Sequence, residues 1–373
     1  MTERIPMIID VDTGIDDAIA LLYVIASPDA ELVGATCVGG NVEARQVAIN
    51  TRAVLELAGR DDVEVALGAE QPLARPLRIA PDTHGPEGIG YAQLPPPRRP
   101  LSRRSGPELI VEEIRRRPGE ITLVTTGPLT NLALALQIEP DLPRLVREYV
   151  LMGGAYRVSG NTTPTTEWNI HVDPEAARAV FAAWAAAGAQ AGGAAVGAGG
   201  ASRARRPLAL GLDVTETVPI HPKHLAQLAR RAGSLPDDSI ALERGDDPMR
   251  VTGSVASNPV IRFVCDALRF YMEFHARYDG FYGAYIHDAV AVAAALDRSL
   301  VRSEAVFVDV ETSGELTAGQ TVADWRRLTG KPPNLDVVVE ADTTEFLDRL
   351  IERVGGLAAS RPVDGHINKR LVI

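Results

Sequence analysis

The hydrophobic pattern along the chain alternates between short apolar runs and longer segments with helical spacing. The run from Ile5 to Ile9 is β-branched and uninterrupted, which is typical of a strand buried on both faces. Apolar residues at helical spacing begin near Ile15 and return between Asn41 and Gly59. Further strands are predicted at 31–40, 63–68, 121–127, 149–154 and 208–215.

Repeated strand and helix units predict an α/β fold. We expect a mostly parallel, doubly wound (Rossmann-like) central sheet flanked by helices, because such units need right-handed crossovers. In open sheets of this kind the ligand binds beyond the carboxyl ends of the strands. The residues that follow the predicted strand ends are Asp12, Gly40-Asn41, Thr126-Gly127 and Met152-Gly153-Gly154.

Proline and glycine punctuate this pattern. A Pro-rich loop is predicted from Gln71 to Pro100, and Pro128 and Pro174 are each expected in the first turn of a helix. The Gly/Ala-rich stretch at about 186–206 lacks apolar periodicity, which favours a flexible surface insertion. Apart from it, the sequence predicts a single domain over 1–373.

The composition of the chain narrows the range of possible partners and locations. The chain has 373 residues, 46% of them apolar, and a net charge of −11, which argues against a nucleic acid as partner. No run of eighteen apolar residues occurs and no apolar leader follows the start, so we expect a soluble cytoplasmic protein without a membrane partner. Cys37 and Cys265 lie in apolar segments, as reduced core residues do.

Four carboxylates follow the first strand within eight positions: Asp10, Asp12, Asp16 and Asp17. Such density is self-repelling unless a hard divalent cation neutralises it. Gly14 lets the backbone turn so that Asp12 and Asp17 can converge on one ion. The alternative is that Asp16 or Asp17 only stabilises the start of a helix, which explains one or two of the four.

Two later segments carry candidate chemistry. The stretch 160–174 is a polar loop in which amides and carboxylates surround Trp168, as suits a sugar; a plain surface loop capped by Asp173 is the alternative. His287 and Asp288 open an apolar helix, either as a candidate acid and a fifth metal ligand or as a simple cap.

Together these residues resemble the nucleoside hydrolase family, of the inosine-uridine type that cleaves ribonucleosides to base and ribose. The resemblance covers nearly the whole chain. It rests on DVDTGIDDAIA at 10–20, VGGN at 38–41, THG at 83–85, TTGPLTN at 125–131, LMGGA at 151–155, GNTTPTTEWNIHVDP at 160–174, GLDVT at 211–215, IHD at 286–288 and VDVETSGELTAGQTVADW at 308–325.

The resemblance implies roles for individual residues. A Ca²⁺ ion would be held by Asp12, Asp17, the backbone carbonyl of Thr126 and Asp288, and Asp12 would be the general base toward calcium-bound water. Met152 would lie beneath the ribose, while His84 and Trp168 line the site. The ribose hydroxyls would contact Asp16, Asn41, Asn161, Glu167, Asn169 and Asp288.

His287 would protonate or orient the leaving base, with Tyr278, Tyr282 and Tyr285 as alternatives. The resemblance also implies a homodimer or homotetramer. Trp168, where the family more often has Phe, and Ala289, where Pro is frequent, leave the preferred base open.

Two other classes fit part of the pattern. A phosphatase of the haloacid dehalogenase type also begins with a buried strand and two Asp, but it has Thr or Val where this chain has Gly14. A non-catalytic calcium- or nucleoside-binding protein would need only the ligands and the sugar contacts. Turnover of a ribonucleoside separates an enzyme from such a binding protein.

Overall fold

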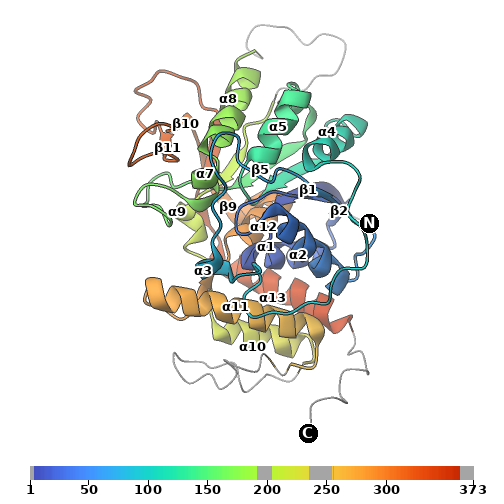
Figure 1. Ribbon diagram of the computed structural model, residues 1–373. Helices are drawn as coiled ribbons and strands as arrows, with labels where there is room; N and C mark the ends of the chain where they lie inside the picture. The colour runs from blue at the N-terminus through green and yellow to red at the C-terminus, as the bar shows by residue number, and fades with distance from the viewer. Residues whose placement is uncertain (1–3, 191–203, 235–253, 255, 362–373) are drawn as a thin grey trace.

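The computed structural model describes residues 4–190, 204–234, 254 and 256–361 (Figure 1). Its main sheet has eight strands in the order β3-β2-β1-β4-β5-β6-β12-β9. Neighbouring strands run parallel except for the antiparallel pair β12 and β9. The bounds in that order are Glu64–Leu67, Ala30–Cys37, Ile5–Val11, Thr122–Thr125, Glu148–Met152, Leu208–Leu210, Leu335–Ala341 and Val301–Val306.

Helices cover both faces of the sheet (Figure 1). One face carries α1 (Ile15–Ala26), α2 (Ala44–Leu57), α12 (His287–Leu296) and α13 (Thr343–Ala359). The other carries α4 (Gly106–Arg116), α5 (Thr130–Ile138) and α8 (Pro174–Gln190). Outside the first layer lie α10 (Pro222–Arg231) and α11 (Pro259–Tyr278), which contact α13.

The core lies in two clusters, one on each side of the sheet. In β1, Met7 and Ile9 belong to the cluster beneath α1, whereas Ile8 belongs to the cluster beneath α4 and α5. Because side chains alternate along a strand, only a strand covered on both faces can be apolar throughout. The predicted doubly wound parallel sheet is confirmed.

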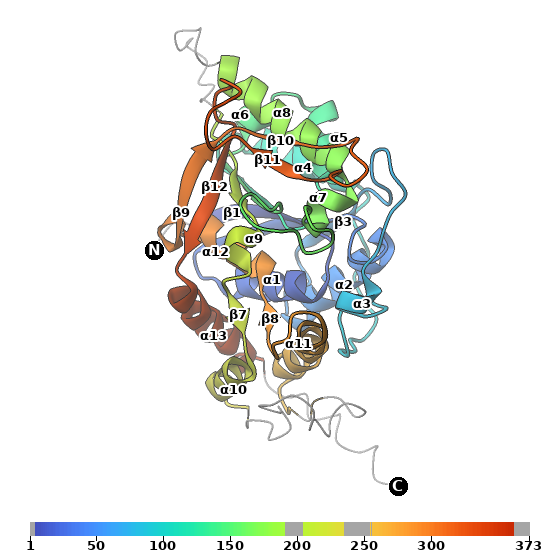
Figure 2. The ribbon, with the colours of Figure 1, turned by 90° about the vertical axis from the view of Figure 1, so that its left-hand side faces the viewer.

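Shorter elements complete the chain. Figure 2 shows α3 beside α11, and α7 and α9 above them near the strand ends. These and the remaining short elements are α3 (Pro81–His84), α6 (Leu142–Leu145), α7 (Trp168–Val172), α9 (Leu212–Thr215), η2 (Arg298–Leu300), the pair β7 (Pro219–Ile220) and β8 (Ala284–Tyr285), and the pair β10 (Val308–Val310) and β11 (Thr321–Ala323).

Several predicted boundaries shift. Helix α5 begins at Thr130 and not at Pro128, because the Thr126 N–H pairs with the Asp10 carbonyl and keeps the chain extended. The strand predicted at 208–215 ends at Leu210, since the Leu212 N–H bonds to the Gly154 carbonyl and starts α9. The predicted loops 71–100 and 160–174 contain the short helices α3 and α7.

The Gly/Ala-rich stretch lies partly outside the described residues. Helix α8 begins at Pro174, as predicted, and continues through residue 190, because alanine is the strongest helix former. Residues 191–203 of the expected insertion at about 186–206 lie outside the described part of the chain. Among the described helices, none combines the length and the apolar character needed to cross a membrane.

Candidate active site

A cavity of about 590 Å³ opens at the carboxyl ends of the central strands. Its volume is that of a pocket for a small organic ligand. Asp12 and Asp17 are fully buried and do not line it. All the other predicted site residues do: Asp16, Asn41, His84, Thr126, Met152, Asn161, Glu167, Trp168, Asn169, His287 and Asp288.

Three carboxylates meet at the inner end of this cavity. Asp16, Asp17 and Asp288 each place an oxygen within 4.8 Å of the others, and all three are buried. Burial, and then the charge of Asp17, raises the pKa of Asp16 to about 8. Burial and the charge of Asp16 likewise raise the pKa of Asp288. This group can hold a metal ion, since a cation would offset the charges that burial and mutual repulsion disfavour.

Asp17 is fixed by three donors. Its carboxylate accepts hydrogen bonds from the Gly14 N–H at 2.9 Å, the Thr126 hydroxyl at 2.8 Å and Asn41 Nδ2 at 3.2 Å. Asp17 lies in the first turn of α1, so the alternative role at a helix start also holds for it. The Asp17 side chain therefore both stabilises the start of α1 and belongs to the group of three carboxylates.

Asp12 lies at the end of the first strand with one oxygen free. Its Oδ2 accepts the Asn41 N–H at 2.8 Å, while its buried Oδ1 has no hydrogen-bond partner in the described structure. Burial, and then the charge of Asp17, raises its pKa. A Cβ at Gly40 would lie 2.1 Å from Asp12 Oδ2, so only glycine leaves room for this carboxylate.

Asp10, the first acid of the sequence signature, has a separate environment. Its Oδ1 accepts the Thr36 hydroxyl at 2.5 Å and Asn131 Nδ2 at 2.7 Å. Burial raises its pKa to about 7. Asp10 therefore ties strands β1 and β2 to helix α5 and does not join the carboxylate group at the cavity.

The polar loop 160–174 contributes the wall opposite α11. Glu167 caps α7 by accepting the N–H groups of Asn169 and Ile170, at 2.8 and 3.1 Å, and also accepts the Gly154 N–H at 2.9 Å. Asn169 Nδ2 donates to the Thr126 carbonyl at 2.6 Å. The segment is thus a positioned wall of the cavity, contrary to the surface-loop alternative.

Two neutral histidines face the cavity. His84 Nδ1 accepts the Ile15 N–H at 3.1 Å, which leaves its proton on Nε2. His287 Nδ1 lies 2.8 Å from the Thr215 hydroxyl. Burial, and then nearby His275, lowers the pKa of both rings to about 3, so both are neutral at pH 7.

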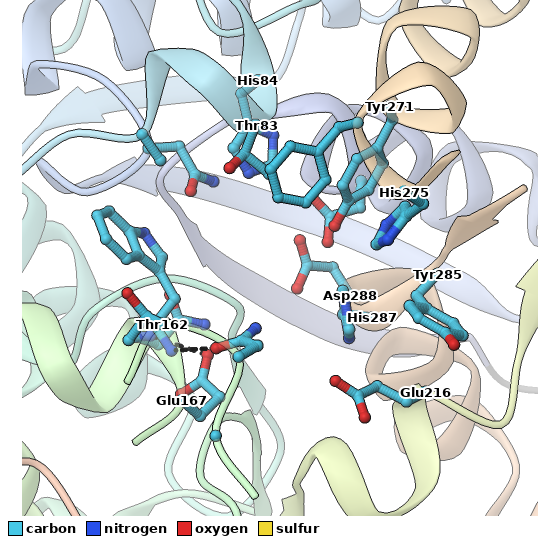
Figure 3. A pocket seen from close by; sticks show the side chains of 18 of the residues that line it. Thr83, His84, Thr162, Glu167, Glu216, Tyr271, His275, Tyr285, His287 and Asp288 are labelled. Atoms are coloured by element: carbon cyan, nitrogen blue, oxygen red, sulfur yellow. Dashed lines mark hydrogen bonds between the residues drawn. The ribbon is translucent and has the colours of Figure 1, made fainter. Parts of the chain in front are cut away.

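The sequence reading found only part of one side of the cavity. Tyr278 and Tyr285 line it as expected, whereas Tyr282 is not among its lining residues. The cavity is also lined by Glu216 and by three further side chains of α11, Tyr271, Phe274 and His275. Their helical spacing was visible in the sequence, but such a stripe more often packs into a core. Figure 3 shows Glu216, His275 and Tyr285 on the side away from Glu167 and Thr162.

Comparison with known proteins shows to which family this chain belongs. The sequence profile described as "Inosine-uridine preferring nucleoside hydrolase" matches residues 7–348. The chain belongs to this family. The enzyme named "Pyrimidine-specific ribonucleoside hydrolase RihA" from Citrobacter koseri is 36% identical over 357 residues, which cover 95% of this chain and 99% of the relative. The protein of the same name from Enterobacter sp. is 38% identical, covering 94% of this chain and 97% of its own length.

Solved structures of nucleoside hydrolases share the fold. "Purine-Preferring Ribonucleoside Hydrolase from Gardnerella vaginalis" superposes with a TM-score of 0.79 at 28% identity and covers 95% of this chain and 99% of its own. "Inosine-Guanosine Nucleoside Hydrolase (IG-NH)" gives a TM-score of 0.76 at 28% identity, with the same coverage. This nucleoside hydrolase is therefore an enzyme that hydrolyses ribonucleosides, and the phosphatase and the non-catalytic binding protein are set aside.

Proposed function

We propose that this nucleoside hydrolase cleaves unphosphorylated ribonucleosides with one Ca²⁺ ion and with Asp12 as general base. The observation that carries the proposal is the meeting of buried carboxylates at the inner end of a cavity whose nearby wall holds fixed amide and carboxylate groups. An oxygen-lined site of this kind suits a hard cation and the hydroxyls of a sugar.

The cation would be held by the carboxylates of Asp12, Asp17 and Asp288 and by the Thr126 carbonyl. All four donors are oxygens, which calcium prefers. Asp16 belongs to the same carboxylate group and lines the cavity, which supports a position between the ion and the ribose. When bound, calcium supplies positive charge that offsets these acids and polarises a water molecule.

Equilibrium dialysis with ⁴⁵Ca²⁺ tests this ligand set. We expect one ion per chain in the wild type and a loss of binding in Asp17→Ala. Asp82→Asn is the control, because Asp82 is an exposed acid at the rim of the same cavity. Equal stoichiometry and affinity in wild type and Asp17→Ala would contradict the assignment.

The ribose would lie against the polar wall and above Met152. Asp16, Asn41, Asn161, Glu167, Asn169 and Asp288 each offer an oxygen or an amide to a sugar hydroxyl. Two buried polar atoms there, Asn41 Oδ1 and Trp168 Nε1, have no hydrogen-bond partner in the described structure, which supports a ligand at this wall. Cleavage passes through a ribosyl cation-like state, and nearby carboxylates stabilise its positive charge.

The residues divide the proton transfers between two sides of the scissile bond. Asp12 takes a proton from the attacking water through its free Oδ1, while the water oxygen bonds to C1′ of the ribose. The electron pair of the breaking C1′–N bond goes to the base. His287, with Tyr285 as the alternative, donates a proton or a hydrogen bond to that base, and His84 lines the site.

The negative charge of the cavity favours nucleosides over nucleotides as substrates. Among the described residues that line it, none is Lys or Arg, whereas six are Asp or Glu. A phosphate group would meet this negative field without a paired cation. A panel of purine and pyrimidine ribonucleosides and their 5′-monophosphates, assayed for release of the free base and, for the nucleosides, of ribose, tests the function. Release of ribose from no nucleoside, or equally fast cleavage of the monophosphates, would contradict it.

The oligomeric state and the cellular location are also inferred from the family resemblance. We infer a homodimer or homotetramer, and light scattering that finds only monomer at micromolar concentration would contradict this. We also infer a cytoplasmic enzyme of nucleoside salvage. The buried thiols of Cys37 and Cys265 support a reducing compartment, and cell fractionation tests the location.

A further inference from the structure

The cavity has two chemically different sides. The polar wall holds Asn161, Glu167 and Asn169, and the opposite side is formed mainly by the rings of α11 and by Tyr285. We call this opposite side the aromatic wall, made of Tyr271, Phe274, His275, Tyr278 and Tyr285. With the ribose at the polar wall, the base lies at the aromatic wall. Glu216 is an acid on that second side, and Figure 3 shows it beneath Tyr285.

The backbone holds Glu216 firmly beside His287. Glu216 ends α9, and its N–H bonds to the Leu212 carbonyl at 3.3 Å. The preceding residue, Thr215, places its hydroxyl 2.8 Å from His287 Nδ1. Two residues later Val218 accepts the Ile286 N–H at 3.4 Å, next to the β7 and β8 pair. These contacts fix Glu216 relative to the residue that faces the leaving base.

The Glu216 carboxylate has no protein partner among the described residues. No hydrogen bond or ion pair within the described chain reaches it, whereas the two nearby acids are engaged. Asp279 lies 2.6 Å from His275 Nδ1, and Asp213 accepts the N–H groups of Tyr156 and Arg157, each at 2.8 Å. Partial burial, and then Asp279, raises the pKa of Glu216 to about 7, as expected of an acid without a donor.

We propose that Glu216 is a specificity-determining residue that accepts a hydrogen bond from an exocyclic amino group of the base. A carboxylate only accepts hydrogen bonds, so it attracts the amino group of cytosine or adenine and repels the carbonyl oxygen of uracil or hypoxanthine. The inference rests on the proposed function, because it needs a nucleoside bound with its base at the aromatic wall.

The test compares matched nucleosides that differ at this one group. We define the amino-to-oxo ratio as kcat/KM for cytidine over uridine, and for adenosine over inosine. Glu216→Gln keeps the shape but adds an N–H donor that can bond to a carbonyl oxygen, and Glu216→Ala removes the acceptor. We expect the ratio to fall about tenfold or more in both variants, as losing a hydrogen bond to a charged group predicts.

Dividing the amino-to-oxo ratio of a variant by that of the wild type removes the effect of leaving-group ability. The bases differ in leaving-group ability, but that difference is the same in wild type and variant and cancels. Asp82→Asn, which removes an acid from the rim of the same cavity, should keep the wild-type ratio. If the wild type cleaves nucleosides and both Glu216 variants keep its ratio within about twofold, this inference is overturned. If the wild type cleaves none, the proposed function itself fails.

Discussion

Single residues divide the proposed reaction between water activation and departure of the base. Asp12 is buried at the end of β1 with its Oδ1 free, so Asp12→Asn keeps the shape but removes the proposed proton acceptor and weakens the proposed metal ligand. We expect kcat to fall at least ~10³-fold for every nucleoside. Initial rates of ribose release measure this, with circular dichroism as the control for folding. A loss confined to some nucleosides would argue against a general base.

In the proposed reaction His287 acts on the other side of the bond, so the effect of replacing it should depend on the leaving group. Natural bases need a proton or hydrogen bond to leave, whereas the phenolate of p-nitrophenyl riboside leaves without one. His287→Ala should therefore lower kcat/KM for nucleosides about 10²-fold or more and largely spare the p-nitrophenyl substrate. An equal loss with both substrates would point to Tyr285, for which Tyr285→Phe is the matching variant.

Glu216 links the choice of base to pH. Because its folded-state pKa is raised to about 7, the carboxylate form predominates above pH 7 and the protonated form below it. Burial lowers the pKa of His287 to about 3 and raises that of Tyr285, so both stay neutral from pH 6 to pH 8. Burial also lowers the pKa of His275, whose Nδ1 lies 2.6 Å from Asp279. The other acids that face it are Asp213 and Asp279.

The amino-to-oxo ratio should therefore rise between pH 6 and pH 8 in the wild type. In Glu216→Gln the ratio should stay flat, since the amide does not titrate. Parallel kcat/KM profiles for cytidine and uridine measure this, and both nucleosides keep one protonation state in the range. A rise of equal size in the glutamine variant would assign the titration to another group.

The turn after β2, which contains Gly40, controls the position of the Asp12 carboxylate. A Cβ at Gly40 would lie 2.1 Å from Asp12 Oδ2 and 2.9 Å from Pro128 Cδ, so Gly40→Ala must displace the carboxylate. We expect kcat to fall at least ~10-fold with weaker calcium binding. Gly188→Ala in α8, where a Cβ meets nothing within 4 Å, should keep full activity and gain up to ~1 kcal/mol of stability. Full activity in Gly40→Ala would contradict the rigid turn.

The elements also show why part of the site could be predicted from the sequence. Asp12, Asp16 and Asp17 come from one continuous strand, turn and helix, whose local pattern places them together. Glu216 and the Tyr271, Phe274 and His275 side chains of the aromatic wall were missed because they reach the cavity only through packing of distant segments. Tyr271, for example, contacts His84 with 5.5 Å between ring centroids, although one lies in α11 and the other in α3.

The free-energy cost of burying several carboxylates links metal binding to the stability of the entire fold. Asp12, Asp16, Asp17 and Asp288 are all buried between the central sheet and its helices, and burial raises the pKa of each. A cation that binds only the folded chain adds about 2.7 kcal/mol when its free concentration is 100 times Kd. The free energy of unfolding should therefore rise with the free calcium concentration.

We expect chelation with EDTA to abolish ribose release and to lower Tm by about 3 °C, as that energy predicts for a chain of this size. Excess Ca²⁺ should restore both, and Mg²⁺ should restore less, because Mg²⁺ demands a tighter six-ligand geometry. Scanning calorimetry of the wild type and of Asp17→Ala measures the effect. The variant should show no calcium-dependent shift, since one ligand of the group is missing. If chelation changed neither Tm nor activity, the buried acids would be neutralised by shared protons and not by a metal.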